Sequence, residues 1–195
     1  PTRRSSDLHL PLSNEAVLEA QMLMLQAHNI LNPANGAPIT VPAQDMVLGL
    51  YYITKLRKGA KGEGLTFYGP EEALIAYNEG KVDIHAIINV VAKDLDENGN
   101  IVDKMIKETS VGRVIVNEIV PAEVGYLNTI ISKKSLRDII SDVIKAVGVA
   151  RACEFLDGIK NLGYKMAFEG GLSFNLGDII IPKEKEELVK RGNEE

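Results

Sequence analysis

Apolar residues recur every three or four positions in several parts of the chain, and prolines, glycines or polar residues separate these parts. That spacing is typical of amphipathic helices. The pattern predicts helices over residues 13–28, 45–54, 70–79, 135–147 and 152–169. Residues 84–109 instead predict a β-hairpin, because apolar residues fall on both faces of the first arm and Asn98-Gly99 supplies a type I′ turn. Helices mixed with short strands predict an α+β fold.

The first predicted helix is apolar on much of its circumference. Ser13 is the expected N-cap, and Leu12 with Val17 has the spacing of a hydrophobic staple. Such a helix requires protein cover on several sides. We therefore interpret its methionines, Met22 and Met24, as core residues.

Residues 31–52 join a turn-rich loop to an apolar helix. Asn35-Gly36 is a tight-turn signal, and Asp45 stands where a carboxylate favours a helix N-terminus. Three prolines fix φ within the loop: Pro33, Pro38 and Pro42. The stretch is either an ordinary loop and core helix or a rigid arrangement that holds polar side chains against a partner.

The second half of the chain predicts a helical hairpin. Residues 109–121 are interpreted as a short strand passing into a helix. Ser135 with Asp138 forms a predicted capping box, and Gly148 ends the helix that follows. The next helix stops at Gly170-Gly171, and the short link makes the two helices antiparallel.

Composition narrows the class of protein. The chain has 195 residues, 45% of them hydrophobic, and a formal net charge of −5, which argues against a free-standing nucleic-acid binder. Cys153 is the only cysteine, so no internal disulfide or cysteine zinc cluster forms, and we expect a buried structural thiol. His28 is expected to cap or pack, and His85 to be a strand residue without chemistry. No apolar run is long enough to span a membrane, so we expect a cytoplasmic protein.

Two segments imitate binding motifs. The basic connector from Lys55 to Gly64 contains Gly62-Glu63-Gly64, but it lacks the spacing and the following Lys-Ser/Thr of a P-loop, so we expect a mobile surface loop. Asp94 to Gly99 resembles the first half of a calcium loop. Its twelfth position is Met105 instead of the bidentate Glu, so we reject a calcium site.

Several runs of residues resemble the family of the largest catalytic subunit, beta-prime, of bacterial RNA polymerase. They follow the family's order and cover nearly everything from His9 onward. The matching runs are HLPLSNEAVLEAQMLM (9–24), NILNPANGAPITVPAQDMVLGLYYIT (29–54), AKGEG (60–64), TSVGRVIVNEIVP (109–121) and LGDIIIP (176–182).

The resemblance implies an internal fragment of that subunit. Residues 9–55 would be the end of the active-site barrel domain and the loop and helix after it. Residues 56–182 would be the pore or funnel domain that lines the nucleotide-entry channel, and residues 183–195 the start of a truncated exposed helix. The implied function is a share in DNA-dependent RNA synthesis.

The resemblance places the catalytic chemistry outside this chain. In the family, an Asn-Ala-Asp-Phe-Asp-Gly-Asp loop holds the catalytic Mg²⁺ and lies immediately upstream of His9, so the fragment alone is expected to be inactive and to hold no metal. Zinc would lie elsewhere in the full subunit. The implied partners are the beta, alpha, omega and sigma subunits, with DNA template, RNA and nucleoside triphosphates; no membrane is implied.

Four residues are candidates for the substrate channel. Asn35, Gln44 and Asp45 would face its active-site end, where amides and carboxylates hydrogen-bond a nucleotide or order the metal loop. The alternative is that they cap the turn and the helix. Arg113 is either a phosphate-binding cation of the channel wall or a partner in a packing salt bridge.

Two further expectations concern the chain as a whole. Residues 1–8 do not match the family, and a back-translation of them reads like the end of a sequencing adapter, so we expect a non-native segment. The alternative to the polymerase interpretation is a stand-alone, non-catalytic protein-interaction module.

Overall fold

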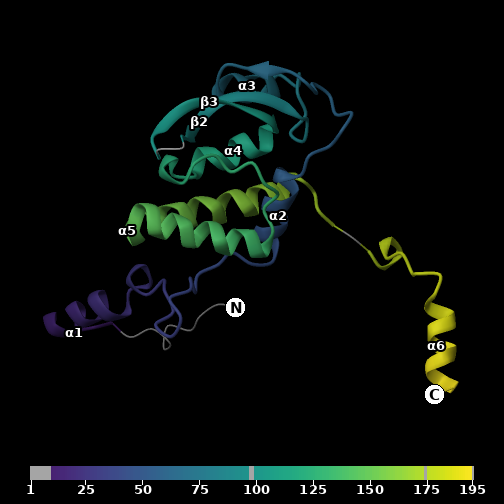
Figure 1. The fold of residues 1–195 in the computed structure, drawn as a ribbon. Coiled ribbons are helices and arrows are strands. Elements are labelled where there is room, and N and C mark those ends of the chain that lie inside the picture. The colour runs from purple at the N-terminus through teal and green to yellow at the C-terminus, as the bar shows by residue number, and fades with distance from the viewer. Residues whose placement is uncertain (1–9, 97–98, 174, 195) are drawn as a thin grey trace.

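A small sheet and a bent helical hairpin form two layers, and α4 (Val111–Ile119) lies between them (Figure 1). The structure is a computed structural model that describes residues 10–96, 99–173 and 175–194. The hypothesis that residues 1–8 are non-native falls outside the described residues. The predicted mixture of helices and short strands, an α+β fold, is confirmed.

The sheet has three strands in the order β1-β2-β3. β1 (Thr66–Phe67) runs parallel to β2 (Ile88–Leu95), and β2 pairs antiparallel with β3 (Ile101–Thr109). The predicted hairpin is therefore confirmed, whereas its type I′ turn includes residues 97 and 98, which are not described.

α3 (Pro70–Asn78) begins at Pro70, the first residue of the predicted range 70–79, and it packs with α4 against β2. These three elements enclose the smaller of two hydrophobic cores. Its buried members are Phe67, Ala73, Val82, Ala86, Ile88, Val90, Val111 and Val114.

The helical hairpin is α5 (Lys133–Glu169), whose two arms meet at Gly148. Gly148 has φ 78° and ψ 174°, a conformation that favours glycine, so the helix turns back at the predicted residue. The predicted capping box is wrong by one turn. Ser132 is the N-cap, and it exchanges hydrogen bonds with Ser135, because the helix starts at Lys133.

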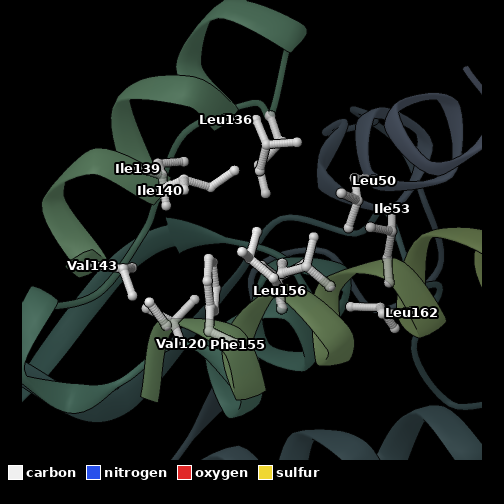
Figure 2. Packing of buried hydrophobic residues seen from close by; sticks show 14 of the residues in the cluster. Leu50, Ile53, Val120, Leu136, Ile139, Ile140, Val143, Phe155, Leu156 and Leu162 are labelled. Atoms are coloured by element: carbon white, nitrogen blue, oxygen red, sulfur yellow. The ribbon is translucent and has the colours of Figure 1, made fainter. Parts of the chain in front are cut away.

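The larger core lies between the two arms of α5 and α2 (Asp45–Thr54), as Figure 2 shows. Leu136 and Ile140 of the first arm face Phe155 and Leu156 of the second. Leu50 and Ile53 of α2 are fully buried at the end of the same core.

α2 crosses α5 with its backbone close to the backbone of the second arm. A Cβ atom at Gly49 would overlap the carbonyl of Gly163, and one at Gly163 would lie 2.7 Å from the carbonyl oxygen of Met46. Side chains at these two positions would push the helices apart. Gly49 and Gly163 therefore allow α2 and the second arm of α5 to pack with their backbones in close contact.

The start of α4 corrects the prediction for residues 109–121. Thr109 is the last residue of β3, and the helix begins at Val111, so the short strand predicted before the helix is the end of the hairpin itself. The hydroxyl of Ser110 caps the helix by accepting a hydrogen bond from the Arg113 backbone N–H. The short 3-10 turn η4 (Ala122–Val124) follows.

The first predicted helix is broken into short pieces, which are α1 (Asn14–Glu19), the π-helical η2 (Ala20–Met24) and the 3-10 turn η3 (Gln26–His28). Ser13 caps α1 as predicted. The side-chain amide of Asn29 donates to the carbonyls of Leu23 and Leu25, and this competes with continued helix. The interpretation of Met22 and Met24 as core residues is wrong, since the two are 61% and 78% exposed.

The C-terminal segment packs against little of the described chain. The 3-10 turn η5 (Leu176–Asp178) and α6 (Lys185–Glu194) contain no buried residue, and α6 is the exposed helix that the sequence predicts. Figure 1 shows this segment extending away from both layers. Across the described ranges, no helix combines the length and the apolar character needed to cross a membrane.

Candidate functional site

The entrance to α2 contains a strained corner formed by Gln44 and Asp45. Gln44 has φ 52° and ψ −124°, and the Met46 N–H donates to the carbonyl of Ala43 at 3.3 Å. These are the features of a type II′ turn, in which glycine is preferred at the position that Gln44 occupies. A non-glycine residue held in such a conformation costs about 1–3 kcal/mol, and strain of this kind is concentrated at functional sites.

The side chains of Gln44 and Asp45 are exposed. Gln44 is the N-cap of α2, but its side chain makes no capping hydrogen bond. Asp45 stands in the first turn, where the helix N-terminus favours a carboxylate. Both polar groups are therefore presented to solvent at a fixed position, which differs from the expected alternative in which they cap the helix.

Asn35 follows that alternative. Its side-chain oxygen accepts a hydrogen bond from the Ala37 backbone N–H at 3.1 Å, while Asn32 does the same for Ala34 at 2.9 Å. The isolated bridge between Leu31 and Pro38 closes the loop around this turn. The side-chain oxygen of Asn35 thus stabilises the turn, and its side-chain amide nitrogen is the group that can donate a hydrogen bond to a ligand.

Arg113 lies at the other end of α2 and is only 5% exposed. Its Nε donates to the carbonyl of Thr54 at 3.1 Å, and Nη1 donates to the backbone and side-chain oxygens of Asn128 at 3.0 and 2.8 Å. Burial lowers the pKa of the guanidinium from its ordinary value. The guanidinium of Arg113 therefore donates to neutral oxygens. These contacts are not the packing salt bridge that the sequence offered as one of its two roles.

Gln44 and Asp45 are neighbours in the chain, and the structure keeps Arg113 apart from them. α2 has ten residues, and at 1.5 Å per residue its ends lie about 15 Å apart. The four candidates therefore do not form a single cluster. Gln44 and Asp45 form the exposed corner, and Arg113 fixes the opposite end of the same helix.

The polar network around Arg113 contains residues that the sequence analysis did not single out. The Thr54 hydroxyl donates to the carbonyl of Leu50 and accepts from the Ile131 backbone N–H at 3.0 Å. The Asn117 side chain exchanges hydrogen bonds with the backbone of Leu127 at 2.7 and 2.9 Å. The available signal was the polar pair Arg113 and Asn117, four residues apart in a helix whose other residues are mostly apolar.

Asp94, from the rejected calcium-loop segment, is bound to the protein's own backbone. Its Oδ1 accepts from the backbone N–H groups of Tyr126 at 3.0 Å and Leu95 at 2.9 Å. The hydrogen bond from Tyr126 is the main reason that the pKa of the carboxyl is lowered, with Leu95 and Lys104 adding to it against the effect of partial burial. Within the described residues, no group of three His, Cys, Asp or Glu side chains could hold a metal ion.

The two histidines that the structure describes, and the cysteine, occupy structural positions. His85 precedes β2 in a turn and is not a strand residue; its ring packs edge-on against Tyr52 at 4.6 Å, and Nδ1 lies 3.0 Å from the carbonyl oxygen of Lys55. His28 Nδ1 lies 3.1 Å from the carbonyl oxygen of Gln21. Cys153 is half-buried at the edge of the larger core, and so less enclosed than expected.

Comparisons with known proteins agree on the family. Residues 29–179 match the family described as RNA polymerase Rpb1, domain 3. The chain is 94% identical over 188 residues to the DNA-directed RNA polymerase subunit beta' of Phocaeicola vulgatus, 88% identical over 188 residues to that of Bacteroides fragilis, and 54% identical over 187 residues to that of Flavobacterium psychrophilum. These alignments cover 96%, 96% and 93% of this chain and 13% of each relative.

The chain thus spans about an eighth of the length of these relatives. The alignments extend over nearly all of this chain. They support the polymerase interpretation over that of a stand-alone interaction module. The chain belongs to the family of bacterial RNA polymerase beta' subunits and carries domain 3 of that family.

Proposed function

We propose that this chain forms part of the surround of the active site and of the nucleotide-entry channel in a DNA-directed RNA polymerase. The observation that supports this function is the corner at Gln44 and Asp45, where backbone strain is retained although both side chains are exposed. Its partners would be the beta, alpha, omega and sigma subunits. DNA template, RNA and nucleoside triphosphates would be the ligands of the complete enzyme.

The proposed division of the parent subunit follows the order of the chain. Residues 9–55 end the active-site domain, residues 56–182 form the pore domain, and residues 183–195 begin a further helix. α2 belongs to the first part but packs with α4 and α5 of the second. The corner at its N-terminus is therefore held in place by the pore domain, which provides a rigid support for polar groups near the reaction.

The metal chemistry belongs to another part of the enzyme. RNA synthesis uses Mg²⁺ to activate the attacking hydroxyl and to stabilise the leaving pyrophosphate, and clustered carboxylates hold it. The described residues do not fit that role, since they offer no group of three suitable ligands. Zinc would likewise bind elsewhere in the subunit, and the isolated chain would not catalyse nucleotide addition.

Each candidate residue has a distinct role in this proposal. The Gln44 amide and the Asp45 carboxylate hydrogen-bond an incoming nucleotide or the neighbouring metal-holding loop. Asn35 holds the turn in the loop before α2 and offers its amide nitrogen. Arg113 acts from a distance, because it ties the last carbonyl of α2 to Asn128 and so fixes the direction of the helix.

The test is Gln44→Gly in the reconstituted polymerase. Glycine removes the amide but adopts the same backbone angles without strain, so the subunit should be no less stable, while nucleotide addition should slow about tenfold through lost positioning. Rates of single-nucleotide addition and thermal unfolding of the complex would measure the two effects.

Glu108 provides the matched control, because it is the other non-glycine residue with positive φ in the described chain, at 53°. Glu108→Gly relieves the same kind of strain at the end of β3 and should leave nucleotide addition unchanged. An unaltered rate in Gln44→Gly would show that the corner serves only to start α2.

A further inference from the structure

The connector between α2 and β1 presents a concentration of positive charge. Lys55, Arg57, Lys58 and Lys61 are all exposed, and none of them forms a salt bridge within the described part of the chain. We call residues 55–64 the basic loop. In Figure 1 it is the blue segment that leads from α2 to the sheet layer. Some exposed cations elsewhere in the described chain pair with a neighbouring carboxylate, such as Lys145 with Asp142 and Lys160 with Asp157.

The basic loop, which the sequence predicts to be a mobile surface loop, is joined to the fold by backbone hydrogen bonds. The Arg57 N–H donates to the carbonyl of His85 at 2.9 Å, and the Gly64 N–H donates to that of Ile87 at 2.8 Å. Between them, the Asp83 N–H donates to the carbonyl of Lys61 at 2.9 Å. The cations therefore project from a backbone whose position is set by the turn before β2.

The one acidic residue in the basic loop is occupied by the loop itself. The carboxylate of Glu63 accepts a hydrogen bond from the Gly59 backbone N–H at 2.6 Å, which closes the loop across its glycine turn. The segment keeps a formal charge of +3 in a chain whose net charge is −5. An anion approaching this chain would therefore be attracted to the basic loop and repelled by much of the remaining surface.

From this arrangement we propose that the basic loop is a polyphosphate-attracting surface, which draws nucleoside triphosphates towards the channel and also receives the released pyrophosphate. The inference rests on the proposed function of the chain, and it adds the chemical group that is recognised. The basic loop and the Gln44 corner occupy opposite ends of α2, about 15 Å apart. The loop thus acts on the approach of the nucleotide and leaves its alignment to the corner.

Three cations can be neutralised together in the reconstituted polymerase with the substitutions Arg57→Gln, Lys58→Gln and Lys61→Gln. We expect the KM for nucleoside triphosphates to rise about threefold to tenfold at low ionic strength, with kcat unchanged, because long-range attraction affects capture and not chemistry. At about 0.5 M salt the difference should vanish, since charges are then screened within a few ångströms.

Two control variants separate charge from structure. Lys145→Gln, Lys160→Gln and Lys165→Gln remove the same charge from the surface of α5 and should leave KM unchanged. Arg57→Lys, Lys58→Arg and Lys61→Arg keep the charge and should behave as the unsubstituted enzyme. A rise in KM that persists at high salt, or one that the α5 variant shares, would overturn the proposal.

The reverse reaction tests which part of the nucleotide is recognised. With pyrophosphate as the substrate of pyrophosphorolysis, its KM should rise by a similar factor in the neutralised variant. An effect on nucleoside triphosphates without one on pyrophosphate would overturn the proposal in favour of base or sugar recognition. Weaker template binding with an unchanged KM would overturn it in favour of a nucleic-acid contact.

The two proposals fail in different ways. A normal KM in the neutralised variant together with a low kcat in Gln44→Gly would overturn only the role of the basic loop. A normal kcat in Gln44→Gly would count against the proposed function itself. Both outcomes come from one set of enzyme preparations measured at two salt concentrations.

Discussion

The middle of the chain and its two flanks differ in what their apolar residues contact. From residue 29 to residue 171, the apolar positions of α2, α4 and α5 face one another in the larger core. In residues 10–25 and 176–189 the apolar residues are largely exposed, with Leu12 at 90% and Ile180 at 91%. Yet both kinds of region draw on the same types of apolar residue, namely leucine, isoleucine, valine and methionine.

The difference shows that apolar pattern and burial within one chain are separate properties. An exposed apolar surface of this extent marks a contact with another protein surface. In a polymerase subunit, such surfaces would be covered by neighbouring parts of the enzyme. The packed middle needs no such partner for its core, whereas the flanks do.

The largest expected effect comes from separating the two kinds of region. The complete chain, expressed alone, should aggregate or pack loosely, and removing residues 1–28 and 172–195 should yield a monomer that unfolds cooperatively, because the larger core is retained. Sedimentation velocity and thermal unfolding would measure both forms. A complete chain that is monodisperse and melts cooperatively would contradict the contrast.

The next effect concerns the crossing of α2 and α5, on which the packed middle depends. Gly49→Ala places a methyl group against the carbonyl of Gly163, and the shift of two helices should lower the free energy of unfolding by about 2–3 kcal/mol. Urea unfolding of the trimmed chain would measure the loss. Gly69→Ala, at a glycine with open space around it, should cost less than about 1 kcal/mol.

The smallest effect concerns the attachment of the sheet layer through Asp94. Because the pKa of Asp94 is lowered in the folded chain, its charge stabilises the fold above the unfolded pKa of about 3.9 and ceases to do so as the pH falls through the lowered value. Asp94→Asn should therefore lower the free energy of unfolding by about 1 kcal/mol at neutral pH.

The difference in the free energy of unfolding between Asp94→Asn and the unsubstituted protein should shrink as the pH is reduced below about 4. Urea unfolding of the trimmed chain would measure it. Asp142→Asn, in an exposed pair with Lys145, should change stability by less than about 0.5 kcal/mol throughout. A difference for Asp94→Asn that stays constant down to acidic pH would mean that its charge has no part in fastening the sheet.

Elements with local signals could be predicted from the sequence. Pro70 marked the start of α3, and Gly148 marked the bend of the helical hairpin; both act through the conformation of their own backbone. The fragmentation of residues 14–28 was not predictable from apolar spacing, because the side chain of Asn29 ends the helix from outside the repeating pattern.

The site was predictable as a list of residues but not as an arrangement. Gln44 and Asp45 were identified by resemblance, whereas the strain at Gln44 is visible only in its backbone angles. Arg113 was expected to meet an acid or a phosphate, and it instead meets carbonyl oxygens from segments 59 and 15 residues away in sequence. Long-range polar contacts of this kind leave no periodic signal along the chain.

The bend at Gly148 also sets the rotational phase of the second arm of α5. Each residue of a helix turns its side chain by about 100°, so one residue inserted between the bend and Phe155 would rotate Phe155 and Leu156 out of the larger core. The same residue added at the exposed tip itself would leave both arms in register. Changes of length in this hairpin should therefore be tolerated at its tip and excluded from its arms.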